Sequence, residues 1–252
     1  MNEFDNKVAL VTGGSSGIGR ATALAFIQKG AKVVIASRRV EEGEKTVKLL
    51  KESGGEAIFI QTDVTKATDV ENLIDQTMAT YGRLDYAFNN AGVEGTGLSI
   101  LEQTEAQWDN IVDTNLKGIW LCCKYQIPQM LKQNKGIIVN SASAFGVVAY
   151  GNYCIYCASK SGVIGLTQSL ALEYAQKNIR INAICPGATE TEMIERFLKG
   201  NEEAKAQFAA LHPMGRMGKP KEIADAVIWL CSENSSFITG HPLVIDGGLT
   251  VQ

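Results

Sequence analysis

Short β-branched runs alternate with longer helical segments along all 252 residues, and this alternation limits the chain to very few folds. The runs predict seven strands, at residues 7–12, 32–37, 57–63, 84–89, 136–141, 179–184 and 242–246. The segments between them predict helices at residues 17–29, 40–53, 69–80, 105–133, 153–176, 192–210 and 221–232. Strands that alternate with helices in this way are parallel and are covered on both faces. We therefore expect a single α/β domain over residues 1–252, built on a doubly wound, seven-stranded parallel sheet.

Two of the predicted helices begin with a recognisable capping pattern. Thr68 and Glu71 predict a capping box at the start of the third helix, and Thr104 and Gln107 predict one at the start of the fourth.

Charge and hydropathy exclude several classes of protein. A formal net charge of -3 gives no basic field for nucleic acid or for an anionic membrane. No run of 18 apolar residues predicts a membrane span, and the acidic start MNEFDNKVALVTGG lacks the basic region of a signal peptide. We expect a cytoplasmic protein with no nucleic-acid partner and no membrane partner.

The six cysteines, at 122, 123, 154, 157, 185 and 231, stand in apolar surroundings without the density of a disulfide scaffold. Cys154 and Cys157 form a C-x-x-C pair, but no second pair follows at metal spacing and the chain has only two histidines. We interpret the cysteines as small packing residues and predict no metal site.

Ligands of such a sheet bind beyond the carboxyl ends of the strands, and the first strand ends at a glycine loop. The stretch TGGSSGIG, residues 12–19, has the spacing Gly13-x3-Gly17-x-Gly19, which differs from the dinucleotide fingerprint G-x-G-x-x-G. Its glycines allow a pyrophosphate to approach the backbone, and the following helix offers free N–H groups. A tight turn without a ligand is the alternative reading of this loop alone.

Further motifs follow the later strands. They are NNAG (89–92), NLKG (115–118), Ser143, Tyr156-x3-Lys160, PG (186–187) and ITGHPLVIDGG (238–248). In this joint order, over essentially the whole chain, the sequence resembles the short-chain dehydrogenase/reductase family, which implies a Rossmann-like fold. Ser143 precedes Tyr156 by 13 residues, the customary interval in that family, and this spacing favours Ser143 over the competing Ser141.

Tyr156 and Lys160 lie four residues apart on a predicted helix and therefore share one face. A phenol has a pKa of about 10, and bringing it to 7 takes about 4 kcal/mol. One ammonium about 4 Å away, at an effective dielectric constant of about 20, supplies roughly that amount. Tyr156 is thus predicted to be a general acid for ketone reduction and a general base for alcohol oxidation. A surface pair with no role is common for this spacing alone, but Ser143 and the glycine loop argue against it.

The resemblance implies roles for the remaining site residues. Ser143 would bind the substrate oxygen, Lys160 would also hold the nicotinamide ribose, and Asn115 would hold a water in a proton relay. The cofactor-binding set that it implies is Gly13, Ser15, Ser16, Gly17, Ile18, Gly19, Ser37, Arg38, Arg39, Asp63, Val64, Asn89, Asn90, Ala91, Gly92, Tyr156, Lys160, Pro186, Gly187, Thr189 and Thr191. The family more often has Ile or Val where this chain has Thr189, so a backbone contact is expected there.

The end of the second strand indicates which dinucleotide is bound. A carboxylate there binds the ribose 2′-hydroxyl of NAD and repels the 2′-phosphate of NADP. The chain has Ser37 at this position, followed by Arg38 and Arg39, and the next carboxylate is Glu41. We predict NADP(H), with Arg38 as the main determinant and Arg39 as a secondary one. Two solvated arginines at the start of a surface helix are the alternative.

The substrate pocket is expected beside a segment at about residues 188–215. Its predicted lining is Val93, Glu94, Phe145, Val147, Tyr150, Tyr153, Met193 and Phe197. This mostly apolar and aromatic set favours a carbonyl compound with a hydrophobic substituent. Glu94 is interpreted either as a contact for a polar group or, more simply, as a solvated loop carboxylate.

The sequence therefore predicts an NADP(H)-dependent oxidoreductase that moves a hydride between the nicotinamide and a ketone or secondary alcohol. Reduction of 3-oxoacyl thioesters on acyl carrier protein is the alternative within this class, and a non-catalytic dinucleotide-binding regulator is the alternative outside it. Sugar-nucleotide epimerases and dehydratases on related folds have an extra C-terminal region that this chain lacks. Apolar residues on the helix at 105–133, together with the small residues of the Tyr156 helix, predict a homotetramer.

Overall fold

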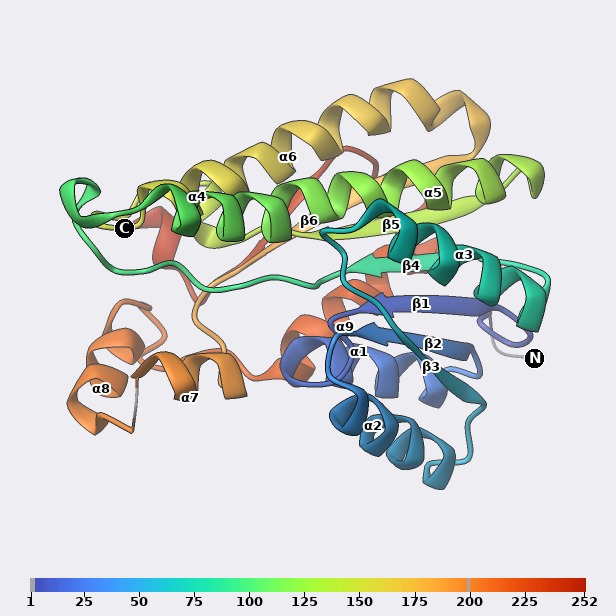
Figure 1. Cartoon of the computed structure of the whole chain (residues 1–252), viewed down its shortest axis with the longest axis horizontal. Helices are drawn as coiled ribbons and strands as arrows, with labels where there is room; N and C mark the ends of the chain where they lie inside the picture. Colours follow the sequence, from blue (N-terminus) through green and yellow to red (C-terminus); the bar gives the residue numbers. More distant parts are fainter. Residues whose placement is uncertain (1–2, 199) are drawn as a thin grey trace.

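The computed structural model describes residues 3–198 and 200–252 of the chain. Its strands are β1 (Val8–Thr12), β2 (Lys32–Ser37), β3 (Ala57–Gln61), β4 (Tyr86–Asn89), β5 (Gly136–Ser141), β6 (Ile179–Pro186) and β7 (Pro242–Ile245). All pair in parallel, in the order β3-β2-β1-β4-β5-β6-β7 (Figure 1). The strand order reverses at β1 and β4, so the expected doubly wound fold is confirmed. Residues 1, 2 and 199 of the expected domain lie outside the described residues.

Helices cover both faces of this sheet (Figure 1). They are α1 (Gly17–Gln28), α2 (Val40–Glu52), α3 (Ala67–Tyr81), α4 (Glu105–Val112), α5 (Gly118–Lys132), α6 (Cys154–Tyr174), α7 (Glu192–Leu198), α8 (Glu202–Ala210) and α9 (Pro220–Cys231).

Alternate residues of each strand enter two separate cores. In β1, Ala9 and Val11 pack with α1, α2 and α9. Val8 and Leu10 pack on the other face with α3, α5 and α6. Since successive side chains of a strand point to opposite faces, a strand that is apolar throughout, as β1 is, must be covered on both sides.

Two predicted helices are not continuous α-helices in the structure. The helix at 192–210 is two helices, because Gly200 has a φ of +73° and the Asn201 side chain caps α8 by accepting from the Ala204 N–H. The helix at 105–133 continues through a π-helical turn, Asp113–Lys117, between α4 and α5.

The capping box expected at Thr68 and Glu71 is wrong, whereas the box at Thr104 and Gln107 is confirmed. Helix α3 begins at Ala67 with Lys66 as a cap that makes no side-chain hydrogen bond. The Asp69 carboxylate accepts from the Asp63 N–H at 3.0 Å and closes this turn instead.

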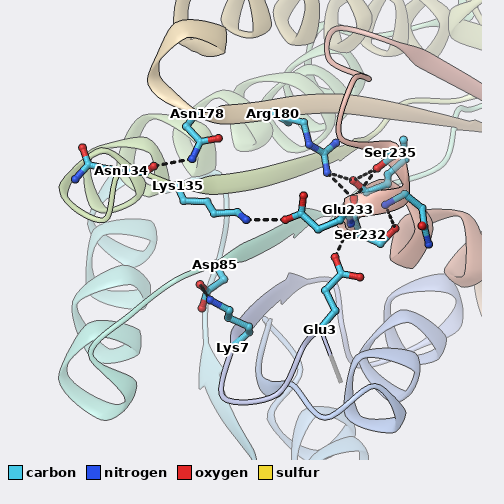
Figure 2. Close-up of polar contacts among 12 residues, drawn as sticks. Glu3, Lys7, Asp85, Asn134, Lys135, Asn178, Arg180, Ser232, Glu233 and Ser235 are labelled. Carbon is cyan, nitrogen blue, oxygen red and sulfur yellow. Dashed lines mark hydrogen bonds and ion pairs between the residues drawn. The ribbon is translucent and has the colours of Figure 1, made fainter. Parts of the chain in front are cut away.

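Polar contacts close the amino edge of the sheet, where β4, β5 and β6 begin (Figure 2). The Arg180 guanidinium donates to the carbonyls of Ile238, Leu230 and Ser232 at 2.8–3.1 Å. Lys135 forms an ion pair with Glu233 at 2.7 Å. This edge is therefore structural. The two hollows described below, a groove and a pocket, lie at the opposite, carboxyl edge of the sheet, where α7 and α8 also lie (Figure 1).

Candidate active site

The loop after β1 is wound so tightly that only glycine fits at two of its positions. An added Cβ at Gly19 would lie 2.3 Å from the Gly13 carbonyl oxygen, and one at Gly13, where φ is +65°, would lie 2.9 Å from Asn90 Nδ2. Asn90 Nδ2 donates to the Thr12 carbonyl at 3.1 Å, and Thr12 Oγ1 accepts from the backbone N–H groups of Asn90 and Ala91. The structure thus joins the glycine loop to the NNAG motif.

A long groove crosses the carboxyl edge of β1, β2 and β3 from this loop. Of the residues predicted to bind cofactor, it is lined by Gly13, Ser15, Ser16, Gly17, Ile18, Ser37, Arg38, Arg39, Asp63, Val64, Asn90, Ala91, Gly92 and Thr191. Of the other seven, Tyr156, Lys160, Pro186, Gly187 and Thr189 line the adjoining pocket, and Gly19 and Asn89 line neither hollow. Gly19 packs on Gly13, and Asn89 is fully buried, with its amide donating to Gln126 and Asn140 at 3.0 Å.

Two features of the groove suit a bound dinucleotide. The Thr114 hydroxyl lines it, is buried, and has no hydrogen-bond partner among the described residues. The two arginines after β2 supply positive charge, and Arg39 donates to Ser16 Oγ at 2.9 Å and to Ser15 Oγ at 3.3 Å. An unpaired buried donor and paired cationic side chains suit a ligand with hydroxyl and phosphate groups.

An apolar pocket with about 1000 Å³ of empty space, part of it open to solvent, adjoins this groove. Ser143, Tyr156, Lys160, Pro186, Gly187 and Thr189 line it, together with the predicted residues Val93, Glu94, Phe145, Tyr153, Met193 and Phe197. Val147 and Tyr150 do not line it; Val147 is exposed, and the Tyr150 ring stacks on Phe145 with a centroid distance of 4.7 Å.

Lys160 is 4% exposed and lies beneath Tyr156 on α6. Its Nζ donates to the Ser141 carbonyl at 2.8 Å and lies 5.7 Å from the centroid of the Tyr156 ring. Burial lowers the pKa of this ammonium to about 8. The lysine therefore loses its charge more readily than an exposed lysine does.

Tyr156 lies half-buried in this pocket, between the Lys160 face of α6 and Ser143. Burial raises the pKa of its phenol above the usual value, and a hydrogen bond with the Ser143 hydroxyl opposes that rise. The two residues brought together by the 13-residue interval are thus in contact, whereas Lys160 does not lower the pKa of Tyr156 in the protein alone.

Asn115 occupies the π-helical turn and is completely buried. Its Oδ1 accepts from the Val93 N–H at 2.7 Å, and its Nδ2 donates to the Val93 carbonyl at 3.0 Å. The widened turn therefore directs the amide at the loop after NNAG. An added Cβ at Gly92 would lie 3.1 Å from Asn115 Oδ1 and 3.7 Å from Lys160 Nζ, so the amide and the ammonium flank the same spot.

Sequence reasoning missed two residues that shape the site. His212 is 2% exposed, and its Nε2 accepts from the Ala188 N–H at 3.1 Å, so Nδ1 carries the proton that is donated to the Phe208 carbonyl at 2.9 Å. Glu192 reaches the glycine loop and accepts from the Gly17 N–H at 2.9 Å. Neither pattern is readable from the sequence, because both side chains act on backbone groups far along the chain.

The cysteines only partly match the prediction. Four are buried, but Cys154 is exposed and Cys157 is partly exposed on α6. Within residues 3–198 and 200–252, no three His, Cys, Asp or Glu side chains are grouped as metal ligands. None of the helices in this part of the chain is both long and apolar enough to cross a membrane.

Comparison with known proteins agrees with this geometry. A family model described as enoyl-(acyl carrier protein) reductase matches residues 13–250. The 2,5-dichloro-2,5-cyclohexadiene-1,4-diol dehydrogenase of Sphingobium indicum is 41% identical over 99% of both chains. Cyclohexanol dehydrogenase of an Acinetobacter species is 39% identical over 99% of this chain and 97% of its own. The crystal structure of levodione reductase has a TM-score of 0.95 and 37% identity, and covers 98% of this chain and 99% of its own.

Proposed function

Since the chain belongs to the short-chain dehydrogenase/reductase family, whose oxidoreductases act on alcohols and ketones with a nicotinamide dinucleotide, we propose that it interconverts a secondary alcohol and a ketone with NADP(H). The observation that carries this proposal is the meeting of Ser143, Tyr156 and Lys160 where the apolar pocket adjoins the long groove. A regulator that only binds a dinucleotide has no need of this set.

The residues of the pocket divide the chemistry among them. Bound nicotinamide supplies or accepts the hydride. Ser143 holds the substrate oxygen, and the Tyr156 hydroxyl gives that oxygen a proton during reduction or takes one during oxidation. Thr189 Oγ1 donates to the Gly187 carbonyl at 3.1 Å, so Thr189 would contact the carboxamide through its backbone.

The side chains after β2 support NADP(H) over NAD(H). Arg38 and Arg39 both line the groove, and the hydrogen bonds of Arg39 to Ser15 and Ser16 hold one guanidinium against the glycine loop. Ser37 Oγ donates to the Arg39 carbonyl at 3.2 Å, where a carboxylate would repel a phosphate. We therefore assign the 2′-phosphate to the two arginines, with Arg38 as the main determinant and Arg39 as the secondary one.

Aromatic side chains favour a cyclic substrate. The ring centroids of Phe145 and Tyr153 lie 5.8 Å apart, those of Tyr153 and Phe197 lie 6.3 Å apart, and those of Phe197 and Phe208 lie 5.8 Å apart. All four residues line the pocket, and such a wall packs well against a flat or puckered ring. Two relatives are named for cyclohexanol and for a cyclohexadiene diol, which points to the same class.

A relative named 3-oxoacyl-[acyl-carrier-protein] reductase, from Thermotoga maritima and 38% identical over 98% of this chain, favours a second candidate, reduction of the 3-oxo group of an acyl thioester on acyl carrier protein. The test is an assay of cyclic ketones, linear ketones, 3-oxoacyl thioesters and the matching alcohols, with NADP(H) and NAD(H) in parallel. We expect cyclic compounds with NADP(H) to give the highest kcat/KM. A clear preference for thioesters would show that the substrate is an acyl thioester and not a cyclic ketone. No turnover with any compound would favour a regulator that only binds the dinucleotide.

We also propose a homotetramer built on α4, α5 and α6. Trp108 and Trp120 are 50% and 44% exposed, and Leu172 on α6 is 85% exposed, whereas Ile111 and Ile119 are buried within the subunit. Large exposed apolar side chains on neighbouring helices suit an interface between copies. Light scattering at micromolar concentration should give the mass of four chains, and a monomer alone would contradict the proposal.

A further inference from the structure

Helix α7 begins directly above the glycine loop. An added Cβ at Gly17, where φ is +49°, would lie 2.9 Å from Thr191 Cγ2, so the start of α7 rests on the start of α1. The side chains of α7 divide between the two hollows. Glu192 and Arg196 line the groove, Ile194 and Phe197 line the pocket, and Met193 lines both, as does Thr191 just before the helix. This helix therefore covers both the groove and the pocket, and we call it the α7 roof.

One carboxylate fastens this roof to α1. Glu192 Oε2 accepts from the Gly17 N–H at 2.9 Å, and Oε1 pairs with Arg20 NH1 at 3.1 Å. Both oxygens of a single side chain thus bind the first turn of α1, 175 residues earlier in the sequence. The free N–H groups and the positive end of that helix favour a carboxylate at this place.

Arg20 is itself held in position, so the contact is rigid on the α1 side. Its NH2 donates to the Ser15 carbonyl at 2.7 Å, and its Nε donates to Thr46 Oγ1 at 3.3 Å. The guanidinium therefore presents NH1 to Glu192 from a fixed direction. The side chains of Arg20 and Glu192 are 37% and 41% exposed, so water and salt can compete with the pair.

From these contacts we propose that Glu192 is a positioning residue that clasps the α7 roof to α1 and thereby sets the rate at which the dinucleotide is exchanged. A contact of two partly exposed groups is strong enough to favour the closed roof and weak enough to open thermally. Glu192 touches neither the reacting atoms nor Tyr156, so it acts on entry and release and not on proton transfer. The inference needs only a bound nicotinamide dinucleotide, whichever of NADPH and NADH is preferred.

The test is the dissociation rate of the reduced dinucleotide, followed by its fluorescence in stopped flow after mixing the complex with excess oxidised form. Glu192→Ala loses both contacts, and Glu192→Gln keeps an oxygen for the Gly17 N–H but loses the ion pair. We expect dissociation to be about three- to tenfold faster in Glu192→Ala, and smaller acceleration in Glu192→Gln. Glu195→Gln, an exposed carboxylate on the same helix, is the matched control and should behave as wild type.

A second measurement separates the clasp from general damage. In an Arg20→Met background, Glu192→Ala should accelerate dissociation less than it does in wild type, because one of its two contacts is already absent. With a substrate in hand, KM for the dinucleotide should rise while kcat stays level or increases. Dissociation rates within twofold of wild type in Glu192→Ala, an equal effect of Glu195→Gln, or full additivity with Arg20→Met would each overturn the inference.

Discussion

Lys160 offers the sharpest test of the site, because its burial makes the stability of the folded chain depend on pH. Its ammonium has a pKa lowered from 10.5 to about 8 by burial, and its hydrogen-bond partner is the neutral carbonyl of Ser141. A lysine with a lower pKa in the folded than in the unfolded chain binds fewer protons when folded, so its contribution to stability rises with pH. That contribution is complete above pH 10.5 and is lost as the pH falls through 8.

The magnitude follows from the two pKa values. Each unit of difference corresponds to about 1.4 kcal/mol, so keeping Lys160 charged in the folded protein costs about 3 kcal/mol at pH 7. The same linkage relation gives a cost of about 1 kcal/mol at pH 9.5. Relative to Lys160→Met, wild type should therefore gain about 2 kcal/mol of unfolding free energy between these two pH values.

The assay is chemical denaturation of wild type and Lys160→Met, without dinucleotide, at pH 7.0 and pH 9.5. Leaving the Ser141 carbonyl unpaired adds a constant loss to the variant, which cancels in the difference between the two pH values. Other groups titrate in this range as well, but they do so in both proteins. Lys205→Met, which removes an exposed ammonium, is the control. Its unfolding free energy should change with pH as that of wild type does. The burial argument would be refuted if the unfolding free energy changed equally between pH 7.0 and pH 9.5 in Lys160→Met and in wild type.

Three further predictions concern the proton, the phosphate and the amino edge of the sheet. Tyr156→Phe should keep the fold and dinucleotide binding and lose nearly all turnover, since it removes the transferable proton and little volume; near wild-type kcat would contradict the mechanism. Ser37→Asp combined with Arg38→Leu should move the ratio of kcat/KM from NADP(H) toward NAD(H) by about tenfold or more; an unchanged ratio would speak against the phosphate assignment. Arg180→Met should lower the unfolding free energy by about 2–4 kcal/mol, because buried carbonyls lose their donor, while Lys135→Met at the exposed ion pair should change it by less than about 1 kcal/mol; equal effects would show that the Arg180 contacts carry no special weight.

The doubly wound parallel sheet was predictable because it depends on a pattern repeated along the whole chain. Seven buried runs separated by helical segments allow few arrangements other than a doubly wound sheet, and the glycine loop marks its first strand. Element ends were less predictable, because single side chains decide them. Strand β3 stops at Gln61, short of the predicted 63, where the Asp63 carboxylate turns back to accept from the Thr65 backbone and hydroxyl. The pair Gly200 and Asn201 was a readable break between α7 and α8 that the helical pattern concealed.

Ser143, Tyr156 and Lys160 were predicted from their order and spacing, which resemble those of the family, and the structure brings all three to one pocket. Residues of the site were not readable where a side chain binds distant backbone, as Glu192 does at Gly17 and His212 does at Ala188. The π-helical turn under Asn115 also leaves no mark in the sequence, although it directs that amide at Val93. Contacts between a side chain and a backbone group place no demand on the residue type of the partner, so no motif records them.

The state of Tyr156 shows why spacing alone misjudged its pKa. A lysine four residues away was expected to stabilise the phenolate, yet the Lys160 ammonium binds the Ser141 carbonyl, and burial raises the pKa of the phenol. Burial acts on both groups in the direction that opposes charge, because each is moved away from water without a partner of opposite charge. The Ser143 hydroxyl is the group of the chain that favours the phenolate in this arrangement. A bound nicotinamide dinucleotide would bring positive charge and hydroxyl groups to this pocket, so we expect Tyr156 to ionise near neutral pH only in the complex. The pH dependence of alcohol oxidation should accordingly report the complex with the dinucleotide, and a phenolate seen near neutral pH in the ligand-free protein by ultraviolet difference spectroscopy would contradict this reasoning.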